Sequence, residues 1–116
     1  MADYFLFLYD DPMGWTKLSP QEMQTALEKY IGWSQKATAG GYLVGSHRLA
    51  EDVGKVIRGR KVTDGPYSET KEILGGYFLI KADSYDQAVQ RSLDHPHLEY
   101  GGTIEVRQVH PMHDPK

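Results

Sequence analysis

The sequence predicts one α+β domain, in which two helices cover one face of a mainly antiparallel sheet. Three observations support this class. Short apolar segments with a period of two are interleaved with two segments of helical period. A serine-led capping signal precedes each helical segment, and an Arg58-Gly59-Arg60 turn joins two short central strands. The 116 residues fit a single domain spanning 1–116, with a frayed tail at 111–116.

The first strand and the first helix carry the clearest patterns. Residues 4–9 are apolar on both alternating faces, which is typical of a central strand covered on both sides. Ser19-Pro20-Gln21-Glu22 forms a capping box with proline at the first helical position, and Gly40 and Gly41 end the helix. The expected inward stripe of this helix is apolar: Met23, Ala26, Leu27, Tyr30, Ile31 and Ala37.

The remaining segments follow in a regular order. Strands are expected at 42–49, 53–58, 61–63, 75–82 and 103–110, with a capped helix from Ser84 to Leu93. The order β-α-β, hairpin, β-α-β is that of a ferredoxin-like split βαβ fold with an inserted hairpin. Two helices cover only one face of such a sheet. Because the other face also carries aromatic side chains, we expect a homodimer that packs sheet against sheet.

Composition excludes several classes of function. The chain has no cysteine, which excludes disulfide scaffolds, thiolate metal sites and cysteine nucleophiles. Its net charge of −3 does not suit direct nucleic-acid binding. Residues 4–9 are too few to span a bilayer, and no basic segment precedes them. We therefore expect a cytoplasmic protein without membrane partners, and no pattern of a cofactor site is present.

The glycine pair Gly75-Gly76 stands just before a core strand. Glycines there allow a bulge or a close approach of neighbouring backbones. The preceding Asp64-Gly65-Pro66 has the composition of a tight turn. A purely structural role, as turn and bulge residues before a strand, explains the whole stretch. Loop residues on a rigid scaffold often carry function as well, so a functional role is the alternative.

The stretch DGPYSETKEILGGYFLI, residues 64–80, resembles the signature of the DGPF-domain proteins of the YCII-related superfamily. Further similar stretches are YFLFLYDD, SPQEM, GGYLVG and GGTIEVRQV, so the resemblance covers nearly the whole chain. Tyr67 replaces the phenylalanine of the tetrapeptide that names the family. The resemblance implies a dimeric α/β barrel and says little about activity, apart from loose links of some members to transcription initiation.

The resemblance also implies a pair of acid–base residues. Members of the superfamily carry a histidine in the first helix and an aspartate in a D-P-[YF] segment after the second. These positions correspond here to Tyr30 and to His95 of His95-Pro96-His97. A Tyr/His pair therefore replaces the proposed His/Asp pair. Of the two, His95 is the better candidate base, because tyrosine loses its proton only near pH 10.

Four further residues are candidates for ligand binding. Ser34 lies one helical turn after Tyr30 and points toward the sheet or its rim. If Ile104 and Val106 face the helices, Glu105 and Arg107 point into the dimer interior, where they meet a ligand or form a salt bridge. Asp64 is either a carboxylate at a cleft mouth or a turn residue that bonds to its own backbone.

His95 and His97 allow two interpretations beyond catalysis. Their spacing would let both imidazoles bind one metal ion together with a third ligand such as His47 or Asp94, but the sequence has no third ligand at a spacing that indicates a metal site. Capping of the second helix's C-terminus is the interpretation that we favour. No metal site is predicted. The leading hypothesis is a homodimer that binds a small polar or anionic ligand near the dimer interface, with or without acid–base catalysis. The rival hypothesis is a non-catalytic regulatory or protein-interaction module.

Overall fold

The computed structural model describes residues 1–11, 17–50, 52, 54–65 and 72–111. Nine elements follow the predicted order, with one short helix added after the second. They are β1 (Ala2–Asp10), α1 (Pro20–Ala39), β2 (Leu43–Arg48), β3 (Lys55–Arg58), β4 (Lys61–Asp64), β5 (Ile73–Ala82), α2 (Tyr85–Ser92), α3 (Pro96–Glu99) and β6 (Thr103–Gln108). The proposed turn at Pro66 and the polar segment after it lie outside the described residues, as does the tail from residue 112.

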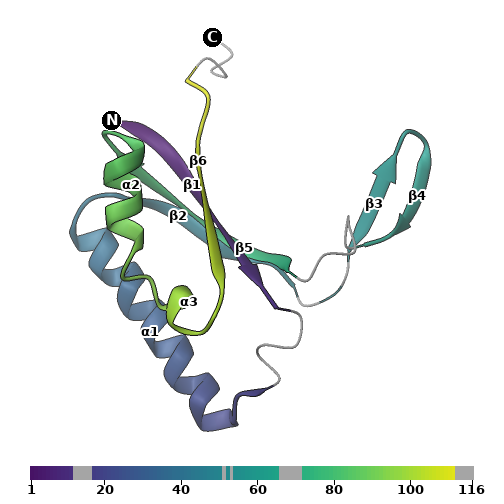
Figure 1. The fold of residues 1–116 in the computed structure, drawn as a ribbon, viewed down its shortest axis with the longest axis horizontal. Coiled ribbons are helices and arrows are strands. Elements are labelled where there is room, and N and C mark those ends of the chain that lie inside the picture. The colour runs from purple at the N-terminus through teal and green to yellow at the C-terminus, as the bar shows by residue number, and fades with distance from the viewer. Residues whose placement is uncertain (12–16, 51, 53, 66–71, 112–116) are drawn as a thin grey trace.

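The main sheet has the strand order β2-β5-β1-β6, and all three neighbouring pairs are antiparallel. Figure 1 shows the three helices on one side of this sheet and the β3–β4 hairpin standing apart from it. The core forms where the helices meet the sheet, because alternate residues of β1 and β5 point to that side. Its members are Tyr4, Leu6, Leu8, Trp33, Ala37, Phe78, Ile80, Ala82 and Ala88.

The opposite face of the sheet carries aromatic and aliphatic side chains that the chain leaves half-buried. Phe5 stacks on Phe7 with ring centroids 5.1 Å apart, and Tyr77 meets Phe5 edge-on at 5.4 Å. Leu79 is the cross-strand partner of Phe5. This face is therefore apolar, as both faces of the first strand predicted, and no described helix covers it.

Helix α1 begins as its sequence predicts, and only part of the predicted stripe is buried. The Ser19 side chain accepts a hydrogen bond from the backbone N–H of Glu22, whose carboxylate accepts from the N–H of Ser19, so the capping box is complete. The buried residues of α1 are Ala26, Trp33 and Ala37. Ala26 and Ala37 were expected inward, and this is confirmed. The prediction was wrong for Leu27 and Ile31, which are 36% and 58% exposed, and it missed Trp33.

The segment after α2 is tied to α1 by side chains. Nε1 of Trp33 donates to Oδ1 of Asp94 at 2.9 Å, and Nζ of Lys29 pairs with Oε2 of Glu99 at 2.5 Å. Pro96 opens α3, and Nδ1 of His95 accepts the backbone N–H of His97 at 3.0 Å as the N-cap. His95 therefore begins a new helix. The alternative in which it caps the C-terminus of the second helix was wrong, because proline starts a helix more readily than it continues one.

Glycine is needed at Gly75 and at Gly76 for different structural reasons. Leu8 pairs with Gly76 and Tyr9 pairs with Leu74, so Gly75 is the extra residue of a β-bulge. A Cβ at Gly76 would lie 2.7 Å from the carbonyl oxygen of His47, where the backbones of β5 and β2 run closest. Both expectations for the pair, a bulge and a close backbone approach, are confirmed.

The hairpin turns at Arg60 and Gly59, and Gly59 adopts a φ of 62° that suits glycine. Its exposed apolar pair, Ile57 and Val62, are cross-strand partners.

Within the described residues, no helix is long and apolar enough to cross a membrane.

Candidate functional site

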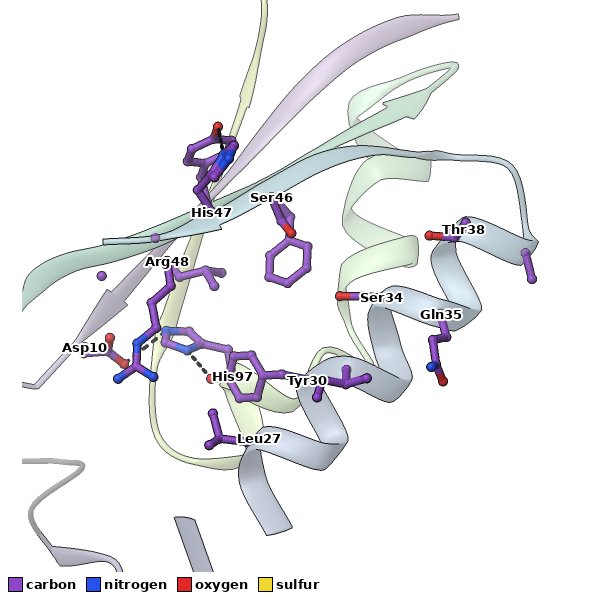
Figure 2. A pocket seen from close by; sticks show the side chains of 17 residues that line it. Asp10, Leu27, Tyr30, Ser34, Gln35, Thr38, Ser46, His47, Arg48 and His97 are labelled. Atoms are coloured by element: carbon purple, nitrogen blue, oxygen red, sulfur yellow. Dashed lines mark hydrogen bonds and ion pairs between the residues drawn. The ribbon is translucent and has the colours of Figure 1, made fainter. Parts of the chain in front are cut away.

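A cavity of about 720 Å³ opens between α1 and the part of the sheet formed by β2 and β5. Figure 2 shows its wall on α1, where Leu27, Tyr30, Ser34 and Thr38 succeed one another along the helix. Leu8, Gly76 and Phe78 of the sheet contribute to the lining, and His97 comes from the start of α3. The volume falls in the range of small-molecule sites.

The imidazole of His97 contributes to the cavity wall and is 2% exposed. Its Nδ1 lies 2.7 Å from the hydroxyl oxygen of Tyr30, and its Nε2 lies 2.9 Å from the carbonyl oxygen of Tyr9. Oδ1 of Asp10 lies 3.7 Å from the same Nε2. Helix α1, the end of β1 and the start of α3 therefore each contribute one part of a single cluster.

The hydrogen-bond partners define the direction of the bonds. A backbone carbonyl can only accept, so Nε2 of His97 carries the proton that is donated to Tyr9. In the neutral imidazole Nδ1 is then the acceptor, and Tyr30 donates its phenolic proton to it.

The electrostatics keep Tyr30 protonated. Burial raises the pKa of Tyr30 well above its ordinary value of 10.0, and the nearby Asp10 carboxylate raises it further, while Arg48 opposes this change. Tyr30 is therefore a neutral hydroxyl at physiological pH. Figure 2 shows the Arg48 side chain reaching from β2 toward Asp10 and His97. The cluster thus joins a carboxylate, a guanidinium, an imidazole and a phenol.

His95 lies behind this cluster and does not line the cavity. It is 1% exposed and packed among rings: its centroid is 4.5 Å from that of Trp33, 4.7 Å from Phe78 and 5.4 Å from Tyr30. Its Nε2 has no hydrogen-bond partner among the residues that the structure describes. Burial lowers the pKa of His95 to about 4, with a further contribution from His97. A catalytic role for His95 stays a prediction, and its surroundings favour a neutral, structural imidazole.

The structure separates the other predicted site residues. Ser34 lines the cavity together with Tyr30. Glu105 and Arg107 face away from the helices, as predicted, and lie 3.6 Å apart as an ion pair, while the Tyr9 hydroxyl donates to Glu105 at 3.0 Å. Asp64 pairs with Lys55 at 2.5 Å in the hairpin. These last three side chains do not line the cavity, and their roles in ligand binding stay predictions.

Three members of the cluster were not predicted from sequence as catalytic or ligand-binding residues: Asp10, Arg48 and His97. Asp10 ends β1, and Arg48 ends β2, so both stand at strand termini, where a polar residue after an apolar segment is a usable signal. His97 was named only as a metal or capping residue. His47, one residue before Arg48, points to the other face, where its Nδ1 lies 2.6 Å from the hydroxyl oxygen of Tyr77.

Among the described residues, no three His, Asp or Glu side chains are grouped in a way that could hold a metal ion. The side chains of His97, Tyr30, Asp10 and Arg48 supply hydrogen bonding, charge and a path for proton transfer at the cavity.

Comparison with known proteins supports the fold and the family. One solved structure with a similar fold is 5-chloro-2-hydroxyhydroquinone dehydrochlorinase (TftG) from Burkholderia phenoliruptrix AC1100 in complex with 2,5-dihydroxybenzoquinone. The TM-score is 0.56 at 10% sequence identity, and the match covers 95% of this chain and 94% of that one. No curated protein matches the chain in sequence. The YCII-related domain matches residues 2–113, and the chain therefore belongs to the YCII-related domain family.

Proposed function

We propose that this chain binds a small molecule with an acidic proton in the cavity beside α1 and transfers that proton through Tyr30 to His97. The observation that carries the proposal is the 2.7 Å contact between the Tyr30 hydroxyl and Nδ1 of His97 at the wall of a 720 Å³ cavity. His97 takes the role of general base that the sequence suggested for His95, because it faces the cavity and His95 does not.

The proton moves in two linked steps. The ligand's acidic O–H or C–H bond breaks as its proton passes to the Tyr30 oxygen, while the phenolic proton passes to Nδ1 of His97. The products are a ligand anion and an imidazolium, and Tyr30 ends neutral. The imidazolium is stabilised by the Tyr9 carbonyl at 2.9 Å and the Asp10 carboxylate at 3.7 Å. Tyr30 acts as a relay because its raised pKa prevents it from being a standing phenolate base.

The residues that line the cavity indicate which kind of ligand would fit. Leu27 and Ile31 leave apolar surface exposed at the cavity, whereas Ser34 and Thr38 supply hydroxyls on the same helix. Arg48 contributes a cation that suits the anion formed by proton transfer. A molecule with an apolar part and either an ionisable hydroxyl group or an acidic C–H beside a carbonyl group meets all three features. TftG, which shares the fold, was solved with 2,5-dihydroxybenzoquinone, and this compound is a suitable first probe.

We expect 2,5-dihydroxybenzoquinone to bind the wild-type protein in isothermal titration calorimetry, and Tyr30→Phe to weaken binding about tenfold, the worth of one hydrogen bond of about 1.4 kcal/mol. Phenylalanine keeps the ring and removes only the hydroxyl. Arg107→Ala serves as the control, because Arg107 lies on the opposite face of the sheet. If Arg107→Ala weakens binding and Tyr30→Phe does not, the ligand site lies at the sheet face and the proposal fails. If neither the wild-type protein nor the two variants bind the compound, the result would favour the rival hypothesis of a non-catalytic regulatory or protein-interaction module.

We also propose that two copies pack through the open face of the sheet, as a dimeric α/β barrel of ferredoxin-like subunits. The stacked Phe5 and Phe7 and the neighbouring Tyr77 and Leu79 supply the apolar surface for this contact. The ion pair of Glu105 and Arg107 lies at the rim of the same face.

Sedimentation velocity tests the dimer directly. The wild-type protein is expected at twice the chain mass of 13.1 kDa, and Phe7→Lys is expected to shift it to the monomer, because a lysine ammonium would have to be desolvated at the contact. Ile57→Lys in the detached hairpin is the matched control and should leave the dimer intact. A folded wild-type monomer at micromolar concentration would contradict the proposal.

A further inference from the structure

Two glycines of the sequence, Gly75 and Gly102, lie against the charged cluster of the cavity. A Cβ placed on Gly75 would be 2.3 Å from Oδ2 of Asp10. One placed on Gly102 would be 2.2 Å from Nε2 of His97 and 2.4 Å from its Cδ2. Real Cβ atoms do not approach so closely, so both side chains of the cluster occupy space that only glycine leaves open.

Backbone conformation does not account for these two glycines. Among the described residues, positive φ occurs only at Gly41, Gly54, Gly59 and Gly101, so neither Gly75 nor Gly102 needs glycine for its dihedral angles. The neighbouring glycine in each Gly-Gly pair does have a backbone reason. Gly101 has a φ of 84°, and Gly76 lies against the backbone of β2. One glycine of each pair thus serves the backbone, and the other faces the cluster.

We propose that Gly75 and Gly102 are positioning residues that hold the Asp10 carboxylate and the His97 imidazole against each other. The inference rests on the proposed function, because the 3.7 Å contact that these glycines permit is the one that stabilises the imidazolium. Gly75 lies in the bulge opposite the end of β1, so a side chain at this position would point at Asp10. Gly102 follows α3 and admits the ring between itself and the Tyr9 carbonyl.

Gly75 and Gly102 differ in whether the neighbouring side chain can move away from an added methyl group. At Gly75 the obstructed atom is the end of the Asp10 side chain, which is about a quarter exposed and can rotate away. At Gly102 the obstructed group is a buried ring bonded on both sides, which cannot rotate away without losing its bonds to Tyr30 and Tyr9. A methyl group at 75 should therefore displace the carboxylate and spare the fold, whereas a methyl group at 102 should disturb both.

The test uses Gly75→Ala and long-range ¹H–¹⁵N spectra of protein labelled at histidine nitrogens. Wild-type His97 is expected to show the tautomer with the proton on Nε2. Gly75→Ala should shift the Nε2 resonance in the same direction as Asp10→Asn, which removes the charge at that place. The double variant should show no further shift, because both changes remove one interaction. Gly32→Ala is the matched control, since nothing lies within 4 Å of a Cβ there.

The proposal is overturned if Gly75→Ala leaves the Nε2 resonance of His97 unchanged while Asp10→Asn shifts it. It is also overturned if the two shifts add in the double variant, since Gly75 would then act on something other than Asp10. The readout needs no ligand, so it can succeed even if 2,5-dihydroxybenzoquinone does not bind. If the His97 Nε2 resonance shifts as expected but 2,5-dihydroxybenzoquinone does not bind, the result counts against the proposed function and not against the role of Gly75.

Discussion

Replacing Trp33 with alanine should lower the free energy of unfolding by about 3–5 kcal/mol, the cost of emptying a large buried site. Trp33 is 5% exposed and stacks edge-on against Phe78 with centroids 5.1 Å apart. It also donates to Asp94 and covers the ring of His95. The loss therefore combines a cavity in the core with a broken link between α1 and the segment that carries α3. Urea unfolding followed by far-UV circular dichroism measures it.

Ile31→Ala provides the comparison on the same helix. Ile31 is 58% exposed, so its truncation should cost less than about 1 kcal/mol. A loss of similar size for both variants would mean that α1 packs on the stripe predicted from the sequence, with Ile31 inward, and would contradict the orientation of the helix in the structure.

Acid should destabilise the protein through His95. The free imidazole takes up a proton near pH 6.5, whereas burial lowers the pKa of His95 in the folded protein to about 4. Between these values the unfolded chain binds more protons than the folded one, so stability falls as the pH is lowered from 6.5 toward 4. The full contribution is present above pH 6.5, and about 3 kcal/mol is lost by pH 4, at 1.36 kcal/mol per pKa unit.

The variant His95→Asn isolates this effect. Asparagine can accept the N–H of His97 in place of Nδ1 and so keep the N-cap, but it does not titrate. Urea unfolding at several values between pH 4 and 7 should show a flatter loss of stability for the variant than for the wild-type protein. The slope is the readout, because asparagine in an aromatic pocket also changes the absolute stability. Parallel slopes would show that His95 is protonated as easily in the folded chain as in the unfolded one.

Local rules explain why so much of the fold could be predicted. The capping box at Ser19, the alternation of Tyr4, Leu6 and Leu8, and the Arg58-Gly59-Arg60 turn each depend on residues a few positions apart. Such patterns are decided by hydrogen bonds and sterics within one element, so the order of helices and strands followed from them. The placement of Glu105 and Arg107 on the outer face followed from the same period of two.

The candidate site depends on residues far apart in the chain, and the sequence predicted only part of it. Tyr30 and Ser34 were expected, and both line the cavity. The histidine that bonds to Tyr30 is His97, 67 residues away, where the family resemblance pointed to His95. The difference comes from Pro96: it starts a short helix and makes His95 its N-cap, so the His95 ring turns into the core and the His97 ring turns toward α1.

By itself the sequence determined the elements, their caps and turns, and the apolar character of both sheet faces, because each is a property of neighbouring residues. Only the tertiary structure decided that Asp10, Arg48 and His97 meet Tyr30, because strand ends and helix starts are brought together by packing of the whole chain. The tertiary structure also placed Gly75 against Asp10 and Gly102 against His97. The space that Gly75 and Gly102 leave open is defined by side chains from other elements, and no local pattern encodes that space.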